Sequence, residues 1–183
     1  MVRTSRNPRP LNSQKLEELA LAYVARFATT RAKLEAYLIR KMRERGWEDD
    51  AQPDIAQLAE RFEEAGYIND EVYARAKAGS LLRRGYGRRR VDQALGHAGV
   101  DESVRDAVPI GEFDLRSAAM NLARKRRFGP FGQPWSDRAV REKQIAAMLR
   151  AGHAMEHVLA MVDARSQQEA EDWARCEGYD VET

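Results

Sequence analysis

The residues of this 183-residue chain best suited to chemistry are the arginines and lysines between positions 75 and 90. Seven cations fall among these sixteen residues, and no acidic residue interrupts them. The guanidinium group of arginine is planar and always charged, so it binds phosphate and carboxylate groups in a forked geometry. The segment therefore predicts a binding surface for an anionic partner, made of Arg75, Lys77, Arg83, Arg84, Arg88, Arg89 and Arg90. The competing interpretation is a solvated helix face, which ordinarily gains stability from acidic residues at i, i+4 spacing.

A second basic cluster lies at positions 124–127, where we expect the end of a helix. Cations interact favourably with the helix dipole at this end, and that role alone is sufficient to explain them. If basic helix ends align along a repeat protein, however, they form a stripe that can follow a phosphate backbone. We therefore add this cluster to the predicted partner- or DNA-binding surface, as Arg124, Lys125, Arg126 and Arg127.

Aromatic residues flank both basic clusters. They could stack on exposed bases, as aromatic side chains do in proteins that bind single strands. Packing in the core or anchoring a loop is the more common role of aromatic residues in such positions. Both interpretations stay open for Tyr86, Phe128, Phe131 and Trp135.

No enzyme signature accompanies the cations. The Gly85-Tyr86-Gly87 segment lacks the third glycine of a dinucleotide-binding loop and is expected to be a turn. His153 and His157 are one helical turn apart, but no further ligand accompanies them, so we predict no metal site. Cys176 lies in an acidic segment, which disfavours a reactive thiolate. We therefore expect a binding protein with no catalytic residue, no cofactor and no metal.

Composition favours helices, because charged residues make up 33% of the chain and aromatic residues only 8%. The net charge of +2 conceals an asymmetry. Residues 163–183 carry seven acids against two arginines, a net charge of −5, so residues 1–162 carry +7. A basic body is attracted to polyanions, whereas an acidic tail reduces non-specific binding or covers the basic face.

The cellular location of the protein can also be predicted from its composition. A single cysteine excludes an internal disulfide framework and suits a reducing environment. No stretch approaches the roughly 18 apolar residues that span a bilayer, and the basic N-terminus lacks the apolar segment of a signal peptide. We expect a cytoplasmic monomer without membrane contact.

Apolar residues recur at helical spacing through the first third of the chain. One stripe runs from Leu16 to Phe27. A second helix is capped by Thr29 or Thr30 and carries Leu34, Leu38 and Met42 before Gly46. A third begins after Pro53-Asp54, with its inner face at Ile55, Leu58, Ala59 and Phe62, and ends at Gly66.

The same cycle then returns further along the chain. An apolar residue lies four positions before Gly46, Gly99 and Gly152, and these glycines are spaced by 53 residues both times. Ile55, Val108 and Met161 follow them at a constant offset. The spacing predicts three tandem three-helix units that stack into an elongated, curved array. Chance is the alternative, because glycine commonly follows a helix.

The predicted organisation is thus all-α. Beyond Asp163 the apolar periodicity thins, and we expect a frayed helix or disorder there. The boundaries are a basic flexible N-terminus at 1–13, three repeats at 14–66, 67–111 and 112–163, and an acidic C-terminal tail at 164–183.

Two blocks of the chain carry a family resemblance. The first reads Arg61-Phe62-x3-Gly66-Tyr67-Ile68-Asn69-Asp70-x2-Tyr73-Ala74-Arg75 and continues as Arg84-Gly85-Tyr86-Gly87-x2-Arg90-Val91-x3-Leu95-x3-Gly99-Val100. It resembles the central repeat of the RecX family, whose members consist of tandem three-helix repeats. A weaker block, from Arg141-Glu142-Lys143 to Leu149-Arg150-x-Gly152, resembles the C-terminal repeat of that family.

The resemblance implies a regulatory protein that binds the RecA–DNA filament and inhibits the ATPase, strand-exchange and coprotease activities of RecA. The arginines from Arg83 to Arg90 would then contact the filament or its DNA. The acidic segment after Asp163 and the basic N-terminus depart from the family pattern, and their roles are open. The alternative functions are a general DNA-binding protein that acts directly on single- or double-stranded DNA, and a helical scaffold for an unrelated acidic partner.

Overall fold

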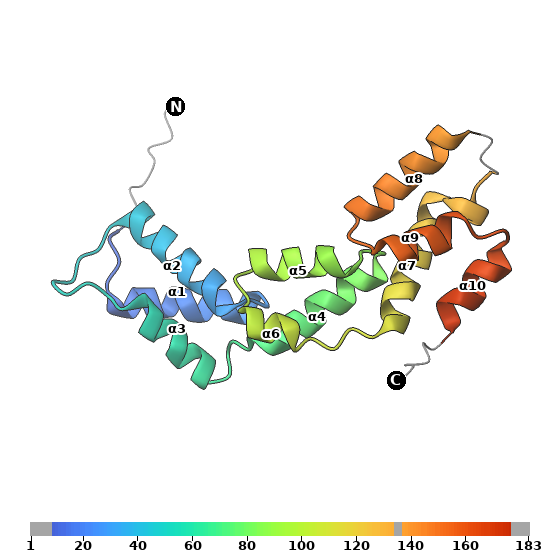
Figure 1. Cartoon of the computed structure of the whole chain (residues 1–183). Helices are drawn as coiled ribbons and strands as arrows, with labels where there is room; N and C mark the ends of the chain where they lie inside the picture. Colours follow the sequence, from blue (N-terminus) through green and yellow to red (C-terminus); the bar gives the residue numbers. More distant parts are fainter. Residues whose placement is uncertain (1–8, 134–136, 177–183) are drawn as a thin grey trace, which may run out of the picture. The chain divides into compact units, whose positions relative to one another are not determined.

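The structure of the protein is a computed structural model that describes residues 9–133 and 137–176. Within these residues the chain forms ten α-helices, α1 to α10, a short 3₁₀-helix and no strand, which confirms the all-α prediction (Figure 1). The chain divides into two compact units. The first comprises Met1–Tyr73 with Ala98–Val104, and the second comprises Ala74–His97 with Arg105–Thr183.

The first unit is built on three helices, each of which begins at a side-chain cap. A side-chain oxygen of Asn12, Thr30 and Asp54 accepts a hydrogen bond from the backbone N–H three residues further on. These bonds satisfy N–H groups that the helix itself leaves free. Thr30 and Asp54 confirm the predicted helix starts. The helices are α1 (Ser13–Arg26), α2 (Arg31–Arg45) and α3 (Ile55–Glu64).

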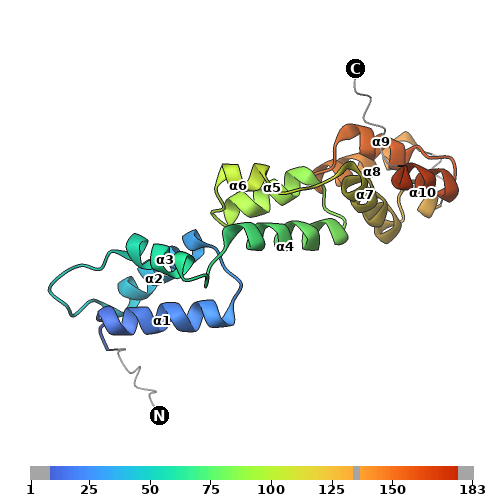
Figure 2. The ribbon, with the colours of Figure 1, turned by 90° about the horizontal axis from the view of Figure 1, so that it is seen from below.

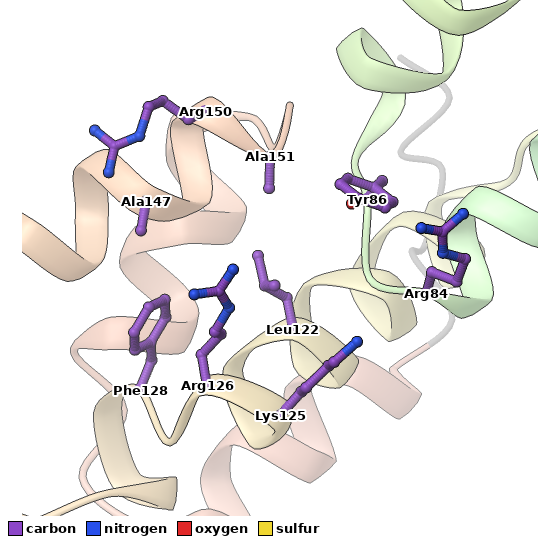
Figure 3. A pocket seen from close by; sticks show the side chains of 9 residues that line it. All are labelled: Arg84, Tyr86, Leu122, Lys125, Arg126, Phe128, Ala147, Arg150 and Ala151. Atoms are coloured by element: carbon purple, nitrogen blue, oxygen red, sulfur yellow. The ribbon is translucent and has the colours of Figure 1, made fainter.

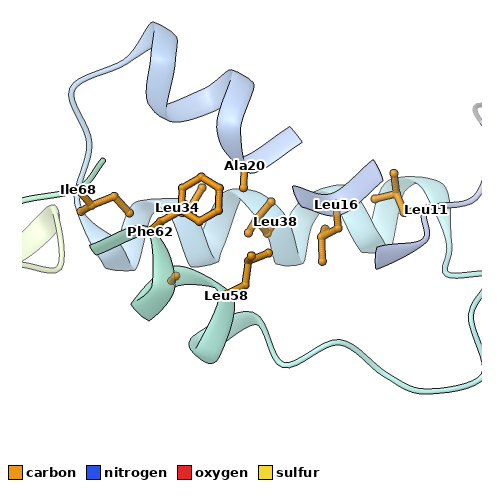
Figure 4. Close-up of a cluster of buried hydrophobic side chains, with 9 residues drawn as sticks. Leu11, Leu16, Ala20, Leu34, Leu38, Leu58, Phe62 and Ile68 are labelled. Carbon is orange, nitrogen blue, oxygen red and sulfur yellow. The ribbon is translucent and has the colours of Figure 1, made fainter. Parts of the chain in front are cut away.

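Leucine side chains dominate the core of the first unit (Figure 4). Leu16, Leu34 and Leu38 are almost fully buried, as the helical spacing predicts, and each buried leucine stabilises the fold by about 1.5–3 kcal/mol. Leu11 joins this core, because its N–H donates to the Gly46 carbonyl at 2.9 Å and its carbonyl accepts from Glu48 N–H at 2.8 Å. The segment before α1 is therefore hydrogen-bonded to the segment that follows α2.

The remaining helices follow in chain order, and α4 and α6 contain residues of both units. None of the described helices combines the length and apolar character that crossing a bilayer requires. Their bounds are α4 (Asp70–Arg83), α5 (Arg88–His97), α6 (Glu102–Asp106), α7 (Glu112–Arg126), η1 (Gly129–Phe131), α8 (Arg138–Arg150), α9 (Met155–Val162) and α10 (Gln167–Arg175).

The hydrophobic cluster around α7 in the second unit contains smaller and more flexible side chains than the core of the first unit. Its buried members come from α7, α8, α9 and α10, which Figure 2 shows gathered together. Small side chains allow backbones to approach closely, so this unit depends on tight helix contacts. The buried residues are Ala119, Leu122, Ala123, Met148, Val158, Met161, Val162 and Ala170.

The acidic segment after Asp163 differs from expectation. Residues 167–175 form α10, which Ser166 caps and which buries Ala170 and Ala174. The prediction of a frayed helix or disorder is wrong for this stretch. Its apolar face consists of two alanines and the half-buried Trp173, so few large apolar side chains mark this helix in the sequence.

The glycines that suggest a repeat share a positive φ angle. Gly46, Gly99 and Gly152 have φ values of 81°, 73° and 92°, the left-handed region that glycine adopts without a steric penalty. The positive φ predicted for Gly46 at the end of the second helix is confirmed. The division into three repeats stays a prediction.

Candidate anion-binding site

A cavity of about 280 Å³ in the second unit gathers cations from three elements (Figure 3). Arg84 follows α4, Lys125 and Arg126 end α7, and Arg150 ends α8. All four side chains are exposed, none forms an ion pair within the described part of the chain, and no acidic residue lines the cavity. We refer to these four residues as the cavity cations. The site they form attracts an anion of limited size.

The cavity owes its shape to close contact between two turns. Gly87 N–H donates to the Ala151 carbonyl at 3.0 Å, and Arg89 N–H donates to the Gly152 carbonyl at 3.2 Å. A Cβ atom on Gly87 would lie only 2.3 Å from the Gly152 carbonyl oxygen. Only glycine fits there, so the predicted Gly85-Tyr86-Gly87 turn is a docking point for the turn between α8 and α9.

A buried histidine adds a further contact between these two turns. His153 Nε2 lies 3.0 Å from the Gly85 carbonyl oxygen, and because a carbonyl only accepts, Nε2 carries the proton. Burial lowers the pKa of His153 from its ordinary value of 6.5, the hydrogen bond to Gly85 partly opposes this shift, and the charge of His157 adds to it. The imidazole is therefore held neutral. Its Nδ1 atom is buried and has no hydrogen-bond partner among residues 9–133 and 137–176.

Apolar and aromatic side chains form the rest of the cavity wall. Tyr86 and Phe128 are half-buried, and the guanidinium of Arg84 lies 5.4 Å from the centre of the Tyr86 ring. Phe128 also packs against the core, so it combines the two roles left open by the sequence. Phe131 lies 5.4 Å from the guanidinium of Arg124, and Trp135 is outside the described residues.

The loop after α7 fixes Phe128 in this position. Its N–H donates to the Ala123 carbonyl at 2.9 Å, and the next N–H, of Gly129, donates to the buried Gln144 side chain at 2.8 Å. Arg127 adopts a left-handed backbone conformation, with φ of 56°, which turns the chain sharply between the helix and the aromatic residue. Phe128 is thus held against the end of α7 beside the cavity cations.

The other predicted cations lie elsewhere. Arg75 and Arg83 line a separate cavity of about 230 Å³ that also contains Asp114. Arg88 pairs with Asp92 at 3.0 Å, and Arg124 pairs with Glu171 of α10. Lys77 is half-buried, whereas Arg89, Arg90 and Arg127 are exposed.

Sequence reasoning missed Arg150 as a site residue. It stands alone in the sequence rather than in a cluster, and only its position two residues before Gly152, at the docking turn, could have indicated its role. The neutralising acids were missed for a similar reason, because Asp92 lies just beyond the acid-free window and Glu171 is 47 residues from Arg124.

The two histidines bind different partners. His157 Nε2 lies 2.9 Å from Glu112 Oε1, and its ring packs edge-on against Trp173. Burial acts to raise the pKa of Glu112, but hydrogen bonds from Arg116 and His157 outweigh it and lower the pKa. In the described ranges, no group of three or more histidine, cysteine or acidic side chains is placed to hold a metal ion.

The sequence of this chain is similar to those of known regulatory proteins. Residues 69–108 match the family model described as "RecX, second three-helix domain". The chain is 32% identical to "Regulatory protein RecX" of Myxococcus xanthus, over 88% of this chain and 91% of that protein. It is 29% identical to the protein of the same name from Mycobacterium sp. strain JLS, over 90% and 91% of the two chains.

Solved structures agree on the fold. The crystal structure of RecX from Lactobacillus salivarius superposes with a TM-score of 0.64 and 18% identity, covering 82% of this chain and 94% of that one. A second structure, described as regulatory protein RecX, gives a TM-score of 0.64 at 19% identity.

Proposed function

Because the chain belongs to the RecX family of regulatory proteins, we propose that it binds the filament that RecA forms on DNA and inhibits RecA. The inhibited activities are ATP hydrolysis, strand exchange and coprotease activity. One observation carries this proposal: the identity to a regulatory protein RecX extends over 88% of this chain and 91% of that relative. The likeness therefore extends well beyond a single three-helix repeat.

The cavity cations supply the physical basis for binding. A nucleoprotein filament presents DNA phosphates and protein carboxylates, and both are anions that arginine binds in a forked geometry. Arg84, Lys125, Arg126 and Arg150 have no competing carboxylate in the cavity, so their charge is available to a partner. Binding that displaces counterions from DNA weakens steeply as salt rises.

Inhibition follows from selective binding rather than from chemistry of this chain. A ligand shifts the equilibrium between two states of its target only by its difference in affinity for them. A protein that binds an inactive filament state more tightly than the active one therefore lowers ATP turnover by population shift. This mechanism needs no catalytic residue in the regulator.

The test is the ATP turnover of RecA on single-stranded DNA, measured as the purified full chain is added at fixed salt. We expect turnover to fall with a saturable dependence on the added chain, and electron microscopy to show shorter or fewer filaments. Unchanged turnover and filament length at a several-fold excess over RecA would refute the proposal.

One observation favours a second candidate function, direct binding to DNA without RecA. The cavity combines unpaired cations with the half-buried Tyr86 and Phe128, a combination typical of proteins that bind single strands. In this case the chain would bind naked DNA and leave RecA turnover unchanged beyond simple competition for the strand. Raising the DNA concentration would then restore full turnover.

A further inference from the structure

We infer that the cavity formed by Arg84, Lys125, Arg126 and Arg150 holds one nucleotide of a single-stranded DNA segment, with its phosphate among the cations and its base against Phe128. The inference rests on the proposed function, because the RecA filament supplies the DNA strand. Beyond the proposed function, the inference specifies which part of the DNA is bound and which side chains bind it.

The charge of the cavity requires an anion. Arg126 and Arg150 approach from two helices, and Arg84 and Lys125 complete a set of four like charges around one space of about 280 Å³. Elsewhere in this unit, arginines near a carboxylate form ion pairs, as Arg88 does with Asp92 and Arg141 does with Asp163 at 2.6 Å. The cavity lacks such an internal partner, so a bound phosphate would relieve the repulsion among its cations.

The wall of the cavity distinguishes a nucleotide from an acidic peptide. A glutamate or aspartate side chain can satisfy the cations but offers no flat ring to Phe128 and Leu122. A nucleotide offers both an anion and a flat π-surface, and stacking on an aromatic side chain needs an unpaired base. The volume is slightly below the usual range for small-molecule pockets, about 300–1,000 Å³, which suits one nucleotide rather than a longer ligand.

The surroundings favour a strand over a free nucleotide. Ala151, which lines the cavity, is followed by Gly152, whose carbonyl accepts from Arg89 N–H at 3.2 Å. The backbone of Arg90 also lies against Gly152. The backbone of the exposed Arg89 and Arg90 therefore lies beside the cavity. Their side chains offer two more cations to the next phosphates of a bound strand.

The experiment measures binding of the full chain to a fluorescent oligo-dT strand of about 20 nucleotides by anisotropy, without RecA, over a range of salt concentrations. The charge variant is Arg126→Gln with Arg150→Gln. Its control is Arg26→Gln with Arg165→Gln, which removes two exposed arginines that form no ion pair within the described residues. The ring variant is Phe128→Leu, which keeps an apolar side chain.

We expect the charge variant to bind at least about tenfold more weakly and to lower the slope of log affinity against log salt by at most about 0.7, the contribution of one phosphate contact. We expect Phe128→Leu to weaken binding by about tenfold with an unchanged slope, because it removes stacking and no charge. The control pair should change affinity by less than about twofold. Far-UV circular dichroism confirms that each variant is folded, and the charge variant alone suffices if Phe128→Leu unfolds.

Several results would overturn the inference. These are no binding of the wild-type chain to oligo-dT, equal losses in the charge variant and its control, or unchanged affinity in both cavity variants. Competition by free dTMP at the same concentration as the strand would show a mononucleotide site, and competition by poly-glutamate alone would show a peptide site. None of these results bears on whether the wild-type chain inhibits RecA, so failure of the proposed function is recognised separately.

Discussion

The paired cations of the first unit contrast with the cavity cations of the second. In the first unit, Arg31 pairs with Glu35 at 3.1 Å and with Glu63 at 3.4 Å, and Lys41 pairs with Glu44 at 2.6 Å. In the second unit, the cavity cations surround a space with no acid in its wall. Clusters of basic residues in the sequence are therefore not equivalent, because distant or neighbouring acids decide which of them remain available for a partner.

The two units also differ in how they hold together. Leucine side chains fill the core of the first unit. The second unit, besides its own hydrophobic cluster, contains a direct backbone contact between the Gly85-Tyr86-Gly87 turn and the turn at Gly152. Side chains of a core can repack, but two backbones in contact cannot. The binding cavity thus lies beside a contact between two turns that tolerates no added side-chain atom at Gly87.

The largest effect is expected from a substitution at the contact between Gly87 and Gly152. Gly87→Ala places a Cβ 2.3 Å from the Gly152 carbonyl oxygen, so we expect a loss of about 3 kcal/mol in the free energy of unfolding of the second unit. Gly66→Ala in the first unit is the matched control. Its φ is 77° but its Cβ meets no atom within 4 Å, so only the backbone penalty of about 1 kcal/mol remains.

Urea unfolding followed by circular dichroism measures both variants. A Gly87→Ala protein as stable as the Gly66→Ala protein would show that the turn contact is not rigid.

A smaller effect concerns pH. His153 is buried and has a lowered pKa, so the unfolded chain takes up a proton below about pH 6.5 more readily than the folded one. The stability that the neutral imidazole contributes is complete above this pH and is lost as the pH falls. We expect His153→Gln, which keeps a hydrogen-bond donor for Gly85, to show a shallower loss of stability between pH 6.5 and 5 than the wild type.

The exposed His97 supplies the control for this pH dependence. Thermal unfolding at a series of pH values should give the same profile for His97→Gln and the wild type. An unchanged profile in His153→Gln would show that the contact between the two turns does not depend on the charge of this histidine.

The smallest effect belongs to the paired cations. Arg31→Gln removes the ion pairs to Glu35 and Glu63, yet the Arg31 side chain is 36% exposed. Exposed ion pairs contribute little, so we expect a loss below about 1 kcal/mol in unfolding free energy and no change in DNA affinity. A loss of affinity comparable to that of a cavity variant would remove the distinction between the two units.

Much of the fold is readable from the sequence because its signals are local. Thr30 and Asp54 cap helices through bonds to the third residue along, and Gly46 and Gly152 end them through their own backbone conformation. The helix α10 was missed because its apolar face has only two alanines and one tryptophan among charged and polar residues.

The candidate site is less predictable because it depends on contacts between distant residues. Arg84, Lys125 and Arg126 belong to recognisable basic clusters, but Arg150 joins them only through the contact between two turns. Arg124 is not available to a partner, because it forms an ion pair with Glu171 of α10, which is distant in the sequence. Local composition therefore indicates an anionic partner and leaves the position of the cavity undetermined.

The most direct test of this account compares two four-charge variants in the RecA ATPase assay on single-stranded DNA. One replaces the cavity cations Arg84, Lys125, Arg126 and Arg150 by glutamine, and the other replaces the paired cations Lys15, Arg31, Lys41 and Arg61. We predict that half-maximal inhibition needs about 100-fold more of the cavity variant and no more than about twofold more of the paired variant. Equal shifts for the two variants would contradict the account.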